Sequence, residues 1–320
     1  MTRSTAGDPV ARPANAPWLG PYLLLSAIWG TSFLFIKIAD RQLSPLQVVL
    51  ARMALGAAVV LAVLLARRER LPSGTRTWGH LALLALISNA LPFSLIAYGE
   101  TQISSVLAGL WNATTPLFTL LIALVVLPEE RPTRQRVGGL LLGFVGVAVV
   151  LGPWSVTGGP SLEGSIAVAG ASVLYGLSFT YLRRYVAVGP GTGVSLVAGQ
   201  LLCGTAMVAV ATVLFTSSPA HVGAGAVLSV LALGALGTGV AYVLNYAVVR
   251  RAGATIASTV TYLIPLVACA CGVVLLNEGI VWNEPAGALV VLAGVALAQG
   301  WLPGRARKTT MSRPQGAGAA

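Results

Sequence analysis

Ten stretches of mostly apolar residues follow one another along the chain, and they constrain its fold more than any other feature. The hydrocarbon core of a bilayer is roughly 30 Å thick, so one crossing helix needs about 20 such residues. Transmembrane β-strands alternate strictly between apolar and polar residues, and these stretches do not. The sequence therefore predicts an all-α integral membrane protein with ten transmembrane helices. They are expected at approximately 18–39, 44–66, 78–99, 104–127, 134–152, 162–182, 191–215, 224–249, 255–276 and 282–302.

The low content of charged residues agrees with a membrane protein. Only 9% of the 320 residues are charged, whereas soluble domains contain about 25%. A net charge of +11 would indicate nucleic-acid binding in a soluble protein. Here the basic residues lie at the ends of the apolar stretches, so the expected surroundings are a lipid bilayer and not nucleic acid. The three cysteines lie within apolar stretches and indicate neither a disulfide framework nor a metal site.

The distribution of basic residues predicts the orientation. Lys and Arg accumulate in the cytoplasmic loops of membrane proteins. Of the 20 Lys and Arg residues, 17 fall on one side when alternate loops are counted, and Arg41 alone falls on the other. Both termini are therefore expected in the cytoplasm of a bacterial cell, whose cytoplasmic membrane the protein would span. The tails at 1–17 and 303–320 are expected to be disordered, the second of them basic.

An internal repeat divides the predicted helices into two halves. The segment "LWNATTPLFTLLIALVVLPEE" aligns with "STVTYLIPLVACACGVVLLNEG", and "IWGTSFLFIK" aligns with "LYGLSFTYLR". The halves are 18–152 and 162–302, with five helices each. Because five is odd, the second half enters the membrane from the opposite side. Inverted repeats are a common construction of secondary transporters, which bind their solute between the halves near the middle of the bilayer.

The order and spacing of these segments resemble the EamA-type transporters of the drug/metabolite transporter superfamily. The resemblance rests on "WGTSFLFIK" at the end of the first helix, on Arg52 in the second, and on "AYGETQISSVLAGLWNATTPLFTLLIALVVLPEER" across the third and fourth. It implies a central cavity lined mainly by helices 1, 3, 4, 6, 8 and 9, with helices 5 and 10 as scaffold. Such transporters export, and sometimes import, amino acids, nucleosides, drugs and other metabolites. Gln200 occupies the position of Arg52 in the second half.

Polar and aromatic residues gather on one face of several predicted helices. Polar groups that face lipid are costly, so these faces are expected to point into the bundle. One interpretation is a substrate cavity, and the other is hydrogen bonding between helices, for which Ser, Thr and Asn commonly serve. The candidate cavity residues are Trp29, Ser32, Asn89, Trp111, Asn112, Thr115, Tyr175, Ser178, Tyr242, Asn245, Thr259 and Tyr262.

Two prolines occupy matching places in the fourth and ninth predicted helices. Pro116 and Pro265 each remove one helical hydrogen bond and free a carbonyl one turn earlier. They are either tolerated kinks, which are common in membrane helices, or functional kinks that bend both helices around the cavity. Their symmetric placement favours the functional interpretation.

Three charged residues fall inside or at the ends of predicted helices. Arg52 lies about two turns into the second helix, where a charge must be paired or hydrated. It either binds a substrate carboxylate or makes structural hydrogen bonds, and the sequence favours the second. Lys37 and Glu100 lie near the outer ends of the first and third helices. They could pair as an outward gate, or Lys37 could extend to the interface.

Closely spaced glycines occur in "GGLLLGFVG" of the fifth helix. Gly139 and Gly143 are separated by three residues, a spacing that permits close helix approach. The contact would be internal, against helix 10, or it would be the seam of a homodimer. Internal packing is favoured, which leaves either a monomer or a homodimer.

Together these features predict a secondary transporter that exports small metabolites, amino acids or related amphipathic solutes first, by alternating access. No Walker A phosphate loop occurs in the sequence, so no ATP and no other cofactor is expected. The sparse carboxylates and histidines make facilitated diffusion or exchange at least as well supported as proton coupling. The alternative is a membrane-embedded enzyme, such as a lipid-linked transferase. That class would need paired acidic residues or a histidine cluster, and the sequence has no DxxD, HxxxH or HExxH motif.

Overall fold

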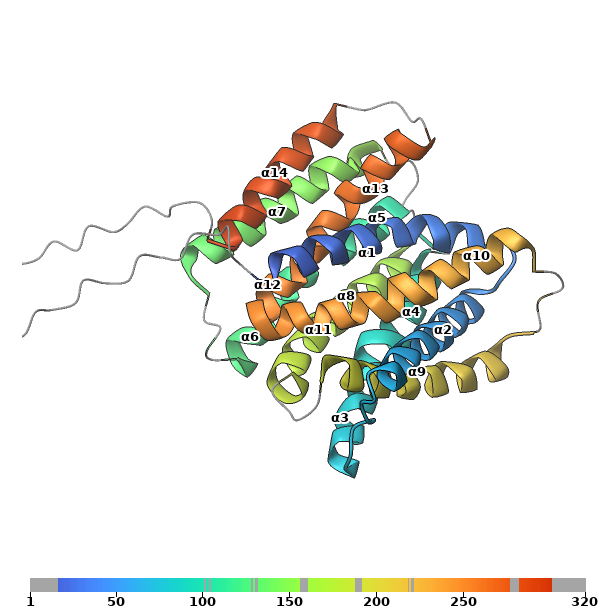
Figure 1. Ribbon diagram of the computed structural model, residues 1–320. Coiled ribbons are helices and arrows are strands. Elements are labelled where there is room, and N and C mark those ends of the chain that lie inside the picture. The colour runs from blue at the N-terminus through green and yellow to red at the C-terminus, as the bar shows by residue number, and fades with distance from the viewer. Residues whose placement is uncertain are drawn as a thin grey trace, which may run out of the picture.

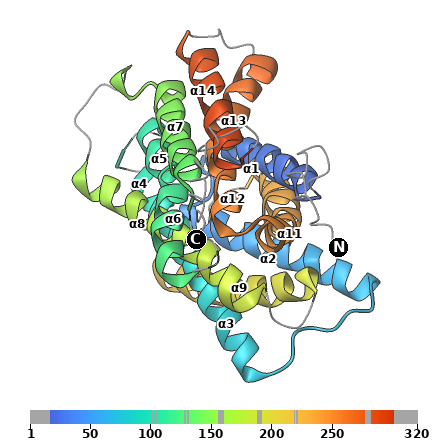
Figure 2. The same ribbon diagram turned by 90° about the vertical axis from the view of Figure 1, so that its left-hand side faces the viewer.

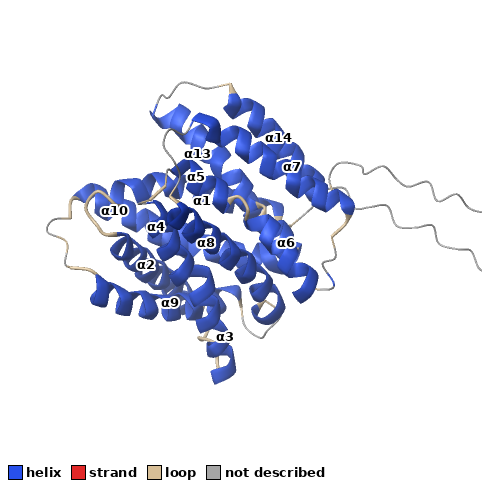
Figure 3. Ribbon diagram, turned by 180° about the vertical axis from the view of Figure 1, so that it is seen from behind, coloured by secondary structure: helices blue, strands red, loops and turns tan. Residues whose placement is uncertain are grey.

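The computed structural model describes residues 17–100, 102–103, 105–127, 129, 132–155, 161–187, 192–217, 219, 222–276 and 282–300, which form a bundle of helices (Figure 1). Every regular element within these ranges is helical, and no strand occurs among them (Figure 3). Apart from Pro17, the two tails that the sequence predicts to be disordered lie outside the described residues.

The helices follow the predicted apolar stretches closely, although several stretches are divided. The α-helices are α1 Leu19–Ala39, α2 Pro45–Ala66, α3 Thr75–Ala85, α4 Leu91–Glu100, α5 Ser105–Asn112, α6 Thr115–Val126, α7 Arg134–Leu151, α8 Leu162–Tyr181, α9 Gly193–Phe215, α10 Ala224–Ala232, α11 Ala241–Ala252, α12 Ala254–Ser258, α13 Val260–Leu276 and α14 Asn283–Ala298. The π-helical segments are η2 Leu86–Ala90, η5 Leu182–Val186 and η6 Leu233–Val240, and a short 3₁₀ turn, η4, covers Pro153–Ser155.

Within the described residues, seven continuous helices are long and apolar enough to cross a bilayer. They cover Pro45–Ala66, Thr75–Gly99, Ala108–Val126, Arg134–Leu151, Leu162–Val186, Gly193–Phe215 and Ala224–Ala252. Helices Ala254–Val267 and Asn283–Ala298 are apolar but shorter. These lengths support a multi-pass membrane protein. The number ten and the orientation stay predictions.

Local sequence signals explain where several helices begin and end. Ser44 and Gln47 form a capping box at the start of α2, which has Pro45 in its first turn. Thr133 and Thr192 accept hydrogen bonds from backbone N–H groups in the first turns of α7 and α9. Gly152 ends α7 in the left-handed conformation, with φ of 54°. The polar residues between the apolar stretches therefore fix the helix boundaries.

Helices α7 and α14 lie side by side, and glycines bring their backbones together (Figures 1 and 2). A Cβ atom added at Gly139 would lie 2.3 Å from the backbone nitrogen of Ala298, and one at Gly294 would lie 2.3 Å from that of Gly143. The small residues thus serve internal packing of the fifth predicted helix against the tenth. Of the two predicted alternatives, internal packing and a homodimer seam, the sequence favours the first.

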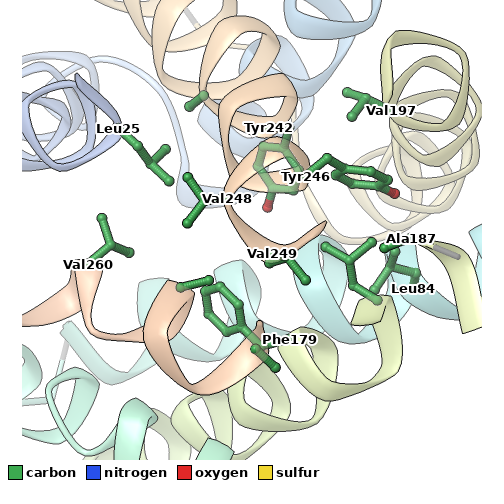
Figure 4. Packing of buried hydrophobic residues seen from close by; sticks show 14 of the residues in the cluster. Leu25, Leu84, Phe179, Ala187, Val197, Tyr242, Tyr246, Val248, Val249 and Val260 are labelled. Carbon is green, nitrogen blue, oxygen red and sulfur yellow. The ribbon is translucent and has the colours of Figure 1, made fainter. Parts of the chain in front are cut away.

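The remaining helices pack around a core that they share with α7 and α14. Helix α1 packs along α13, α8 along α6, and α2 along α9. Their shared core contains fully buried side chains from distant segments, including Tyr22, Met53, Leu201 and Tyr262. Figure 4 shows part of this core around α11, with Tyr242, Tyr246 and Val249.

The fourth and ninth predicted helices are each interrupted. A turn at Ala113–Thr114 separates α5 from α6, and Thr114 N bonds to the carbonyl three residues earlier, 2.9 Å away. Pro116 lies in the first turn of α6, directly after this break. In the ninth helix the boundary lies at Thr259, between α12 and α13, whereas Pro265 lies inside α13. The observed breaks therefore precede both prolines, by two residues in one half and by six in the other.

Candidate functional site

A cavity of about 500 Å³ lies between α1, α2, α4, α5, α8, α11 and α13. Its walls are mainly apolar and include the aromatic side chains of Trp29, Phe93, Tyr175, Phe179 and Tyr242. The Trp29 and Tyr242 rings meet edge to face with centroids 6.3 Å apart, as do Phe93 and Tyr175 at 6.5 Å. Such a cavity has the size and lining of a small-molecule site.

Seven of the twelve candidate residues line this cavity. They are Trp29, Ser32, Asn112, Tyr175, Ser178, Tyr242 and Asn245. Helical periodicity accounts for this, because Tyr242 and Asn245 lie three residues apart on one face of α11. That these side chains contact a solute stays a prediction.

The other five candidates do not line the cavity, because they are occupied in contacts between helices or packed away from it. Asn89 lies one layer behind the wall and donates a hydrogen bond to Tyr242 Oη, 2.5 Å away. The hydroxyls of Thr259 and Tyr22 are 2.8 Å apart, and Tyr262 donates to the carbonyl of Leu140 at 2.9 Å.

Trp111 and Thr115 are likewise packed between helices. Trp111 contacts a small apolar cluster that includes Val168, and its carbonyl accepts a hydrogen bond from Ser172. Thr115 is fully buried, and its carbonyl accepts from the Thr119 hydroxyl at 2.8 Å. Both residues are thus packed away from the cavity, and the buried Thr115 hydroxyl has no hydrogen-bond partner among the described residues.

Arg52 is buried in the cavity wall, with 7% of its surface exposed. Its Nε atom donates to Thr238 Oγ1 at 3.1 Å, and the guanidinium carbon lies 4.5 Å from the centre of the Phe93 ring. Among the described side chains, no carboxylate lies within ion-pair distance of it. The structure thus gives Arg52 one structural hydrogen bond and also a place in the cavity. The side chains of Lys37 and Glu100, and hence the predicted gate, lie outside the described part.

Asn245 lines the cavity and has a side-chain acceptor without a partner. The side chain is 6% exposed, and among the described residues the buried Oδ1 atom has no hydrogen-bond partner. A buried acceptor without a partner is costly.

A buried hydrogen-bond chain lies behind the aromatic wall. Tyr246 donates to Gln200 Oε1 at 2.6 Å, Gln200 Nε2 donates to Asn89 Oδ1 at 2.8 Å, and Tyr242 donates to the carbonyl of Ser88 at 3.1 Å. Asn89, Gln200 and Tyr246 are at most 1% exposed. The chain joins α9, η2 and α11 and fixes the orientation of the Tyr242 ring in the wall.

Gln200, Tyr246, Ser88 and Asp40 also belong to the site or lie directly behind it, although none of them is among the residues predicted to line it. Gln200 is the counterpart of Arg52 and a lone long polar side chain within the apolar stretch 191–215. This pattern in the sequence indicates a buried polar contact. Asp40 follows α1 and lines the cavity while remaining exposed. Partial burial raises the pKa of its carboxyl above the ordinary value. The cavity therefore reaches the surface at the end of α1.

A family model for EamA-like transporters matches residues 18–152 and again 162–299, which together are most of the chain. The chain belongs to the EamA-like transporter family. This EamA-type protein is therefore a multi-pass membrane transporter of the drug/metabolite transporter superfamily. The inverted arrangement of the two halves stays a prediction.

Individual relatives agree with this family. An uncharacterized transporter of Bacillus subtilis, YcxC, is 28% identical over 85% of this chain and 89% of its own length. The uncharacterized protein PA1977 of Pseudomonas aeruginosa is 31% identical over 75% of this chain and 79% of its own. A crystal structure with 24% identity covers 90% of this chain and 97% of its own, with a TM-score of 0.76, which shows the same fold.

Proposed function

We propose that the protein is a secondary transporter that exports small amphipathic metabolites, amino acids or related solutes first, by alternating access between two inverted five-helix halves. The observation that carries the proposal is the 500 Å³ cavity, with aromatic walls and few charges, which reaches the surface at one end. Aromatic faces suit an apolar solute body, whereas Asn112 and the lining serines suit polar groups on it.

Buried side chains border the end of the cavity that lies away from Asp40. Phe179 and Asn245 are buried there, and the chain of Tyr246, Gln200 and Asn89 lies behind them. Farther along, Arg183 donates to the carbonyl of Arg250 at 2.8 Å and so ties the start of η5 to the end of α11. With the predicted orientation, the open end faces outward and the end bordered by buried side chains faces the cytoplasm. Alternating access would require this buried layer to open.

The helix pairs support an arrangement of two related halves. Contact between α1 and α13 involves the first and ninth predicted helices, and contact between α8 and α6 involves the sixth and fourth. These pairs exchange when the two halves are exchanged. Gly30 lies against Val267 in one pair, and Gly176, its repeat counterpart, lies against Phe118 and Thr119 in the other.

Flux into and out of proteoliposomes tests the function. A panel of labelled amino acids and nucleosides is measured with and without a pH gradient, against liposomes without protein. We expect an amphipathic amino acid to cross faster than the protein-free background, and without an absolute need for the gradient. If no solute of a broad metabolite panel crosses above background, the transport of small metabolites is contradicted.

Asn112 provides the matched test of the cavity. Asn112→Ala removes a polar side chain that lines the cavity, whereas Asn283→Ala removes an amide on α14 that bonds to the carbonyls of Val149 and Val150. We expect flux to fall at least about 10-fold in the first variant, given roughly 1–2 kcal/mol for a lost polar contact. Flux in the Asn283 variant should stay near wild type. Equal flux in the two variants would indicate that Asn112 serves contacts between helices and does not contact the solute.

Orientation in the bacterial cytoplasmic membrane is tested by labelling exposed positions. In a cysteine-free background, Arg41→Cys should react with a membrane-impermeant maleimide on intact spheroplasts. Arg184→Cys, also exposed, should react only after permeabilisation. The reverse pattern would place the open end of the cavity in the cytoplasm.

A further inference from the structure

The solute class can be narrowed by the charge inside the cavity. We propose that the cavity binds a solute with a carboxylate, and that Arg52 is the residue that recognises this group. The inference rests on the proposed function, because it names the chemical class that this same cavity carries.

The cavity contains a buried positive charge, that of Arg52. Arg52 is 93% shielded from solvent, and a buried cation is costly unless it is paired or hydrated. Of the described residues that line the cavity, Asp40 is the one acidic group, and it lies at the mouth rather than within ion-pair distance of Arg52. The described part of the chain therefore leaves the guanidinium without a counter-charge, which an anionic group on the solute can supply.

The guanidinium group of Arg52 is also held in one orientation. Thr238 holds Nε, and the Phe93 ring lies beneath the guanidinium carbon, so the plane of the group is fixed. Neither terminal nitrogen of Arg52 donates to a described residue, although a Cβ at Gly237 would come within 3.9 Å of Nη2. A fixed guanidinium with free terminal nitrogens matches the two oxygens of a carboxylate.

The two halves of the chain carry different side chains at the position of Arg52. Gln200 occupies the position of Arg52 in the second half, where both ends of its amide are bonded, to Tyr246 and to Asn89. An uncharged side chain thus satisfies the structural need at that position. The positive charge of Arg52 is therefore an addition to this pattern, and it lies in the wall of the cavity.

The proposal is tested by affinity for three probes that share one aromatic body. They are 3-phenylpropionate, its uncharged primary amide, and the zwitterion L-phenylalanine, measured by calorimetry with the full-length protein in detergent at pH 7.5. We expect both carboxylates to bind at least about 30-fold more tightly than the amide, as for a buried charge-assisted pair. The ratio between the two carboxylates distinguishes a monoanion from a zwitterion as the preferred form. An amide that binds as tightly as the carboxylates, or no binding by any probe at millimolar concentration, would overturn the proposal.

Variants assign the recognition to Arg52. Arg52→Gln should weaken both carboxylates at least about 30-fold and leave the amide unchanged, and Arg52→Lys should weaken them about 10-fold because the planar fork is lost. The matched control is Arg41→Gln, which removes an exposed cation at the same end of the bundle and should change affinity less than about twofold because salt screens it. Carboxylate affinity that survives Arg52→Gln would overturn the assignment.

Two further measurements keep the test decisive. If Arg52→Gln fails to fold, Thr238→Val removes only the bond to Nε and should weaken carboxylates about 3–10-fold, with the amide unchanged. Flux separates this inference from the proposed function. If the flux of solutes is the same in wild type and in Arg52→Gln, the carboxylate site is overturned but the proposed transport function is not. If carboxylates bind through Arg52 but do not cross the membrane, the transport function is overturned but the carboxylate site is not.

Discussion

Gln200 and Asn89 are joined by a hydrogen bond of 2.8 Å between Nε2 and Oδ1, which connects α9 to the π-helical segment η2 behind the cavity wall. Gln200 also accepts from Tyr246, and Asn89 donates to Tyr242. All four side chains are buried. The chain thus links three helical segments through buried polar groups.

Loss of this chain should destabilise the fold measurably. Gln200→Leu leaves Asn89 Oδ1 and the Tyr246 hydroxyl without this partner, and Tyr246→Phe removes one bond. We expect each change to lower the free energy of unfolding in detergent by about 1–2 kcal/mol. Because both variants break the Tyr246–Gln200 bond, the double variant should lose less than the sum of the two. Strictly additive losses would mean that the bond contributes nothing to stability.

The position of this chain shows what the sequence could and could not predict. The stretch predicted at 78–99 is a continuous helix over Thr75–Gly99, because a bilayer demands about 20 apolar residues in regular helix. Periodicity also placed Tyr242 and Asn245 on one face of α11. It does not give the rotation of one helix relative to another, which decides whether a polar face meets a cavity or a neighbour. Thr259 therefore looked like a cavity residue and instead contacts Tyr22.

The unequal halves illustrate a second limit. Pro116 and Pro265 align in sequence, yet the helix break lies two residues before one and six before the other. The reason is that residues near the break decide its place: Thr114 and Thr259 each form a backbone bond to the carbonyl three residues earlier. A proline only forbids its own bond, so neighbouring residues can move the distortion along the helix.

Two adjacent glycines test the packing of α7 against α14. Gly139→Ala would place a Cβ 2.3 Å from the backbone nitrogen of Ala298, which cannot rotate away, whereas Gly138→Ala meets nothing within 4 Å. We expect the first change to lower the free energy of unfolding by about 3 kcal/mol. The second should be neutral or stabilising by up to about 1 kcal/mol, from helix propensity. Thermal or denaturant unfolding in detergent measures both, and similar effects of the two would contradict this helix contact.

The two prolines should respond differently to alanine. Pro116 lies in the first turn of α6, where a backbone N–H has no helical partner, so Pro116→Ala should change stability by less than about 0.5 kcal/mol. Pro265→Ala restores an N–H inside α13 that can bond to the carbonyl of Thr261, and it should stabilise the protein by about 1 kcal/mol. If the kink serves alternating access, flux falls in the Pro265 variant although its stability rises. Unchanged flux would identify Pro265 as a tolerated kink.

The stability of the protein should depend on pH through Asp40 at the mouth of the cavity. Partial burial raises the pKa of this carboxyl in the folded state. The folded protein then binds a proton more readily than the unfolded chain, so this group favours folding at low pH, and the benefit is lost as pH rises through the raised pKa. Asp40→Asn removes the dependence. The variant should therefore match wild type near pH 4 and unfold about 1–2 °C higher at pH 7.5. Melting curves in detergent across this range measure the difference, with Arg184→Gln as a control that removes an exposed charge elsewhere in the chain. A constant offset between Asp40→Asn and wild type at every pH would contradict the raised pKa.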